Sequence, residues 1–141
     1  MPRNQQFFTE LDNAIAEFSQ QAGAFAVQIA TQLFQDIVNG NPYWSGRSKA
    51  SWVISLNAPI EYIADDVPKR AGGITVSEAE ERALATLVNL NGFLVGQTIY
   101  ITNGNPYVEY LEKGRSKQAP DGFVALALTR YQGLGNFQVH Y

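Results

Sequence analysis

The chain has 141 residues, 45% of them apolar and 16% charged, and its formal net charge is −3. This length suits one domain with its own core, and the negative charge disfavours a general nucleic-acid binder, which would present a basic face. The sequence contains no cysteine, which excludes a disulfide framework and a thiolate metal site. It has no apolar region typical of a signal peptide near its start and no apolar run of ~18 residues. We therefore expect no membrane span, and a protein that is made in the cytoplasm and either stays there or leaves the cell inside an assembly.

The first predicted element is a long helix over residues 7–38. Gly40 is a suitable C-terminal residue for this helix, and Pro42 prevents it from continuing. The helix would be about 45 Å long, which is longer than a compact domain of this size needs, so we expect part of it to project or to lie against another molecule. Its apolar stripe, with the three- and four-residue spacing of an amphipathic helix, comprises Leu11, Ile15, Phe18, Ala22, Phe25, Ile29 and Leu33.

Two strands are predicted in the remainder of the domain, which spans residues 46–132. Ser51–Asn57 alternates bulky with smaller side chains, as a strand does, and Gln97–Asn103 has a similar composition. Short stretches at Glu61–Ile63 and Phe93–Val95 are weaker strand candidates. Because the strands are few and helices surround them, we expect an α+β fold with a long N-terminal helix packed on a small, mainly antiparallel sheet.

Three further helices complete the prediction. Ser77 and Glu80 have the spacing of a capping box, and the helix that follows, to about residue 89, would turn Leu84, Leu87 and Val88 inward. A short helix or turn is expected over 106–114, with proline at its start and glycine at its end. The closing helix is expected over 122–131, followed by a flexible tail over 133–141 that includes a candidate final strand at 137–141.

Two short sequences occur twice. Asn-Gly-Asn-Pro-Tyr begins at Asn39 and again at Asn103, and Gly-Arg-Ser-Lys begins at Gly46 and again at Gly114. The separation within each pair and the predicted flanking elements differ between the two copies, whereas a repeat architecture would keep its period. We therefore interpret them as separate turns built from similar residues.

Charge is unevenly placed along the chain. Residues 4–45 contain four acidic residues and no lysine or arginine, and five of the ten basic residues lie in or beside the two Gly-Arg-Ser-Lys segments. This arrangement could steer one copy of the protein onto another. The alternative is a solvated helix face and two solvated loops. The residues concerned are Glu10, Asp12, Glu17 and Asp36, and Arg47, Lys49, Lys113, Arg115 and Lys117.

No residue pattern indicates catalysis, a cofactor or a metal ion. The single histidine, His140, is next to the last residue of the sequence, and a catalytic or metal site would need partners held rigidly around it. The adjacent carboxylates Asp65 and Asp66 are typical of a solvated loop. Ser45 and Ser116 have no general base nearby in the sequence. We expect a protein that is not an enzyme.

Two spans resemble a known family. "GRSKASWVISLN" (46–57) is similar to the segment that follows a long N-terminal helix in bacteriophage tail-completion, or neck, proteins of long-tailed phages. "ITNGNPYVEYLEKGRSKQAPDGFVALAL" (101–128) is similar to the same family's Pro-Tyr helix, glycine loop and closing helix. The resemblance covers roughly residues 5–132. Residues 72–91 are more elaborate than the simple strand hairpin expected there.

The resemblance implies a virion structural protein at the head–tail junction. Such a protein would form a ring, hexameric or dodecameric, between the portal or connector and the tail terminator or tail-tube protein. Genomic DNA would pass through its channel without sequence-specific binding, and no membrane would be involved. A tail-tube terminator ring is the nearest alternative, and a DNA-packaging accessory is a third.

A ring closed by heterologous contacts needs two different patches on each subunit, and the acidic helix and the basic glycine loops are the candidates. On this interpretation both Gly-Arg-Ser-Lys segments are exposed basic turns held by aromatic residues. Replacing Arg47 and Arg115 with glutamate is then expected to impair assembly but not folding. The candidate docking residues are Arg47, Lys49, Tyr107, Tyr110, Glu112, Arg115, Lys117, Glu10 and Glu17, and the structural anchors are Gly46, Trp52, Leu111, Gly114 and Pro120. Tyr107 and Tyr110 are expected to help Leu111 hold their helix against the sheet.

Overall fold

The computed structural model describes residues 5–135, and side chains from residue 23 onward. The described chain is an α+β fold, as the sequence predicts, and its two strands form an antiparallel sheet. The elements in chain order are α1 (Gln5–Gly40), α2 (Arg47–Ala50), β1 (Trp52–Leu56), α3 (Val76–Leu84), the 3₁₀ helix η1 (Ala85–Leu90), β2 (Ile99–Asn103), α4 (Tyr107–Glu112) and α5 (Val124–Thr129).

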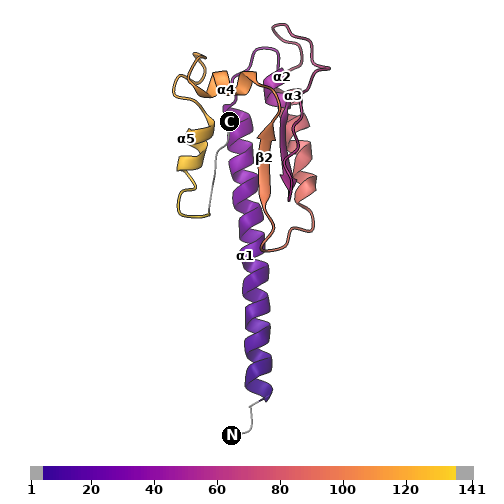
Figure 1. Ribbon diagram of the computed structural model, residues 1–141, viewed down its shortest axis with the longest axis vertical. Helices are drawn as coiled ribbons and strands as arrows, with labels where there is room; N and C mark the ends of the chain where they lie inside the picture. Colours follow the sequence, from indigo (N-terminus) through magenta and orange to yellow (C-terminus); the bar gives the residue numbers. More distant parts are fainter. Residues whose placement is uncertain (1–4, 136–141) are drawn as a thin grey trace.

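Helix α1 is the longest element and extends well beyond the rest of the fold (Figure 1). Its 36 residues correspond to about 54 Å of helix. Its C-terminal turns enter the core, where Phe34 and Val38 are fully buried, whereas Phe25, on the predicted apolar stripe, is 47% exposed. The predicted helix and its projection are therefore confirmed, and the body of the domain covers only part of the stripe.

The two strands supply the centre of the main core. Ile54 pairs with Ile101, and Leu56 pairs with Ile99, so these side chains lie on one face of the sheet. They pack there with residues of α1, α5 and η1, and Ile54 is fully buried. Trp52 belongs to the same cluster and meets the Phe123 ring edge-on at 6.2 Å, which confirms its predicted role as a core anchor.

The edge of β1 that faces away from β2 is covered by η1. The Ile54 amide donates to the Thr86 hydroxyl over 3.1 Å, and the Asn89 side chain donates to the Ile54 carbonyl over 2.9 Å. These two side chains occupy the outward backbone groups of Ile54, so another strand cannot pair with β1 at this residue.

The N-cap of α3 is two residues earlier than predicted. Thr75, and not Ser77, is the N-cap, and its hydroxyl accepts from the Glu78 amide over 3.0 Å. Thr75 and Glu78 have the same spacing as Ser77 and Glu80, so the sequence pattern alone fits both registers.

The inward position predicted for Val88 is wrong. Val88 is 62% exposed, because the chain tightens to a 3₁₀ helix after Leu84 and the rotation per residue changes. Leu90 takes the buried place, while Leu84 and Leu87 pack against the core as predicted.

The two weaker strand candidates are not strands. Residues 93–95 lie in a turn, and residues 61–63 are irregular. The Gly104 amide nevertheless donates to the Tyr62 carbonyl over 2.9 Å, so this segment continues alongside the chain that leaves β2. The candidate final strand at 137–141 lies outside the described residues.

Candidate functional site

The first Gly-Arg-Ser-Lys segment (46–49) is built into the fold. Gly46 adopts a φ of 87° and begins α2, a short helix that the sequence pattern did not reveal. The Lys49 ammonium is buried and donates to the carbonyls of Val38, at 2.7 Å, and Asn39, at 3.2 Å. It also pairs with Glu80 at 3.1 Å. Lys49 thus satisfies carbonyl groups at the end of α1, and the prediction that it lies on an exposed turn is wrong.

Arg47 also has a partner within the chain. Its guanidinium donates to the carbonyls of Asp65 and Val67, each over 3.2 Å, and its side chain is partly buried. These bonds fix the irregular loop that follows β1. A substitution at Arg47 would therefore disturb this loop as well as any contact between subunits.

The second Gly-Arg-Ser-Lys segment (114–117) remains at the surface. Arg115 and Lys117 are exposed. Gly114 has a φ of 79°, and a Cβ atom there would collide with the Pro120 carbonyl oxygen, so the tight turn expected at Gly114 is confirmed. The turn presents both basic side chains to solvent.

Helix α4 divides its side chains between the core and the surface. Leu111 is buried, as predicted for an anchor, and Val108 is buried beside it. Tyr107 and Tyr110 are about half exposed and stack on each other, with ring centroids 5.1 Å apart. The expectation that these tyrosines anchor α4 against the sheet is wrong, because buried and exposed residues follow the three-residue spacing of two different helix faces.

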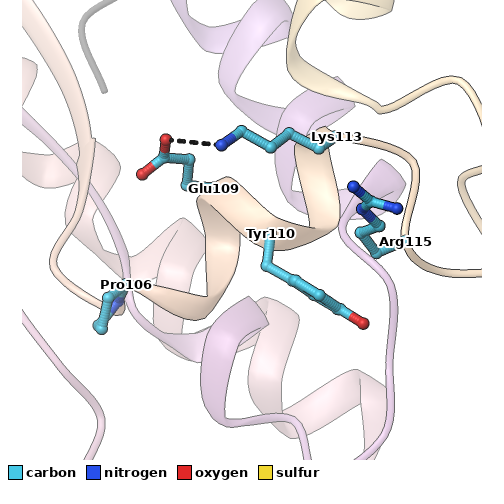
Figure 2. A pocket seen from close by; sticks show the side chains of 5 residues that line it. All are labelled: Pro106, Glu109, Tyr110, Lys113 and Arg115. Atoms are coloured by element: carbon cyan, nitrogen blue, oxygen red, sulfur yellow. Dashed lines mark ion pairs between the residues drawn. The ribbon is translucent and has the colours of Figure 1, made fainter.

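A shallow depression lies beside α4 (Figure 2). It is lined by Pro106, Glu109, Tyr110, Lys113 and Arg115. Glu109 and Lys113 form an ion pair of 3.2 Å across one turn of the helix, and the Tyr110 ring points away from that pair. An exposed pair of this kind contributes only a few tenths of a kcal/mol, so both side chains can exchange partners on binding.

Glu112, a predicted docking residue, is hydrogen-bonded within the fold. Its carboxylate accepts from the amides of Phe123, at 2.6 Å, and of Val124 and Ala125, each at 3.0 Å. These amides are at the start of α5, where helix donors lack partners within the helix. Glu112 thereby joins α4 to α5, a contact between residues 11 to 13 positions apart that the sequence pattern did not indicate.

The two repeated sequences meet in space. The Gln118 side chain makes two hydrogen bonds of 2.8 Å with the backbone of Tyr43, one as donor and one as acceptor. The Asn103 side chain donates to the Ser48 carbonyl over 2.8 Å. The copies are separate turns with different local structures, as predicted, but residues in or beside each copy help to hold the other in place.

Trp44, which no sequence pattern singled out, is 61% exposed. It is adjacent to Tyr43, and so lies close to the loop that carries Lys117 and Gln118. Large aromatic side chains and arginine are enriched at the centres of protein interfaces. We call Trp44, Tyr107, Tyr110, Arg115 and Lys117 the aromatic–basic surface. Its residues belong to segments at the end of the molecule opposite the start of α1 (Figure 1).

Two of the predicted docking residues lie far from the aromatic–basic surface along the chain. Glu10 and Glu17 lie in the projecting part of α1, and their side chains are outside those described.

Arg82 pairs with Asp66 at 2.7 Å, and this hydrogen bond lowers the pKa of the Asp66 carboxyl below its usual value. Among the described side chains, no group of three or more His, Asp or Glu residues could hold a metal ion. None of the described helices has the length and apolar character that crossing a bilayer requires.

Comparison with protein-family models, with curated proteins and with solved structures gave no match for the chain. The candidate function therefore depends on the sequence resemblance and on the geometry of the chain itself.

Proposed function

We propose that the protein is a non-enzymatic structural component of a bacteriophage virion, at the junction between head and tail. In this role identical copies form a ring that links the portal to the tail and leaves a channel for DNA. The order of elements supports the proposal: a long first helix, a strand after Gly46, a second strand, the Pro-Tyr helix α4, a glycine turn and the closing helix α5. The two segments that carry the resemblance are also in contact, through the hydrogen bond from the Asn103 side chain to the Ser48 carbonyl.

The projecting part of α1 is the observation that carries the proposal. A lone helical segment is only marginally stable in water, and the apolar stripe continues through this part as Leu11, Ile15 and Phe18. Phe25, where α1 leaves the body, is already half exposed. A helix that keeps an apolar stripe beyond its own core is well suited to pack against a second molecule, and a neighbouring subunit of the ring would provide one.

The aromatic–basic surface is the complementary patch. It combines three exposed aromatic rings with Arg115 and Lys117, whereas the projecting part of α1 combines apolar residues with Glu10, Asp12 and Glu17. Two unlike patches at opposite ends of one subunit allow a head-to-tail contact that closes into a ring. Opposite charges would orient the subunits, and the aromatic side chains would supply most of the buried area.

The test measures assembly of the purified protein, alone and with portal rings, by light scattering and electron microscopy. The wild type is expected to form closed rings. A variant carrying Arg115→Glu and Lys117→Glu is expected to remain folded and to lose assembly. A second variant, Glu10→Lys with Glu17→Lys, is expected to assemble with the first but not with itself. If the double glutamate variant assembles like the wild type, this docking arrangement is wrong.

The place in the virion needs its own experiment. Phage that cannot make this protein are expected to accumulate DNA-filled heads and separate tails, which electron microscopy distinguishes directly. Purified heads with necks should contain the protein. If it is found on isolated tails instead, it is a tail-tube terminator. Infectious particles that assemble without it would overturn both assignments.

A further inference from the structure

The outer edge of β2 has backbone groups that find no partner among residues 5–135. In an antiparallel pair, residues alternate between those bonded to the partner strand and those directed away from it. The Asn57 amide donates to the Thr98 carbonyl over 2.8 Å, and the Ile54 backbone is directed at η1. With Ile54 opposite Ile101, the amides and carbonyls of Ile99, Ile101 and Asn103 must point away from β1.

No backbone group within residues 5–135 pairs with this edge of β2. Every residue of β2 is partly exposed, and Ile99 and Ile101 are its apolar members. A row of unpaired backbone groups along a sheet edge is a template for another strand. The contrast with β1 is clear, because η1 blocks the equivalent groups of Ile54.

The end of the sequence has the pattern of a strand that would fit this edge. Phe137, Val139 and Tyr141 alternate with the polar residues Gln138 and His140, which is the two-residue period of a half-buried strand. This five-residue segment contains no proline, lysine or glutamate to prevent pairing, and it is as long as β2.

We propose that residues 137–141 of one copy add as a third strand to the free edge of β2 in a second copy. Figure 1 shows α5 and β2 on opposite sides of α1. The described chain ends at Gly135, in the turn region that follows α5 (Val124–Thr129) with no further element between them. Asn136 is then the only connector to residues 137–141, and it spans less than about 7 Å. A helix is about 10 Å across. The connector is therefore too short to carry residues 137–141 past α1 to β2 of the same chain. A neighbouring copy can offer its β2 directly.

The added strand would form main-chain hydrogen bonds to the free edge and bury alternate side chains. Phe137, Val139 and Tyr141 would extend the apolar face formed by Ile99 and Ile101, and Gln138 and His140 would lie on the face of Tyr100. This contact requires self-association but not a place in a virion. Its failure would therefore leave the proposed function untouched, and the reverse also holds.

Crosslinking tests the identity of the second chain, since the protein has no cysteine of its own. Tyr100→Cys and Gln138→Cys are made in separate chains, mixed, and treated with a short bifunctional maleimide. A mixed covalent dimer is expected, and the control pair Ser77→Cys with Gln138→Cys should give none. Absence of the mixed dimer up to the solubility limit would overturn the proposal. A further sample contains a chain that carries both substitutions, diluted in excess wild-type protein. A crosslink within that single chain would also overturn the proposal.

Hydrogen exchange of single amides tests the register. On assembly the Ile101 amide should exchange on the order of tenfold more slowly, whereas the Thr102 amide, which faces β1, is protected in every state. Val139→Pro should abolish the change at Ile101, and Gln138→Ala with His140→Ala should retain it. Both changes lie beyond the described fold, so neither is expected to unfold it. Unchanged exchange at Ile101 in assembled wild type would refute the added strand.

Discussion

The two Gly-Arg-Ser-Lys segments have the same sequence, but the basic side chains of the first contact the fold and those of the second are exposed. In the first, Lys49 is buried against the end of α1 and paired with Glu80, and Arg47 is bonded to the loop after β1. In the second, Arg115 and Lys117 are exposed and make no ion pair with the described residues. The difference shows that a four-residue pattern specifies a glycine turn, while its place in the fold decides whether the lysine is structural or available for binding.

The largest expected difference between the segments is at their lysines. Lys49→Met should lower the free energy of unfolding by about 3 kcal/mol, because it leaves Glu80 and the last carbonyls of α1 without their buried partner. Lys117→Met, the matched control in the second segment, should change it by less than about 0.5 kcal/mol. Urea denaturation measures both. Equal effects would mean that Lys49 is not the buried cap described above.

The second largest difference in stability is expected between substitutions at the glycines of the two segments. Gly114→Ala should destabilise the fold by about 2–3 kcal/mol, because the new methyl group meets the Pro120 carbonyl as well as an unfavourable φ. At Gly46 the nearest atom is Ile74 Cγ1 at 2.6 Å, and the nearest backbone atom, the Ile74 carbonyl oxygen, is 3.3 Å away. Because the closest contact is with a side chain and not with the backbone, Gly46→Ala should be milder than Gly114→Ala. Gly92→Ala, with a φ of 79° and open space around it, reports the backbone strain alone. Thermal unfolding of the three variants would give this order, and the reverse order would contradict the geometry.

The loop of the second segment also depends on Glu112. Glu112→Gln should reduce stability by about 1–2 kcal/mol, because a neutral amide offers one acceptor oxygen to the three amides at the start of α5. Glu109→Gln, on the exposed face of the same helix, is the matched control and should have a few tenths of this effect. Chemical denaturation compares the two. If the variants were equally stable, the link between α4 and α5 would be unimportant.

The smallest effect concerns pH and the loop held by Arg47. The hydrogen bond from Arg82 lowers the pKa of Asp66 in the folded state. The ionised carboxylate therefore contributes stability above its ordinary pKa, and this contribution is lost as the pH falls through the lower folded value. Asp66→Asn should flatten the decline in stability below about pH 4. An unchanged pH profile would show that the exposed pair has no measurable role.

The aromatic residues illustrate the limits of local patterns. Alternation along β1 identified Trp52 as a core residue, and the core does contain it. The same reasoning placed Tyr107 and Tyr110 inward, although the interior at α4 is filled by Val108 and Leu111. Trp44 was missed because an aromatic residue in a turn has no periodicity to indicate its face.

The sequence by itself determined the long first helix, the two strands, the positions of the turns and the α+β class, because these follow from short-range periodicity and from the conformational limits of glycine and proline. Only the tertiary structure decided that Lys49 is buried, that Glu112 caps α5 and that Gln118 binds Tyr43. Each of these contacts joins residues from different elements. Their partners are chosen by the packing of the whole chain, which no local pattern encodes.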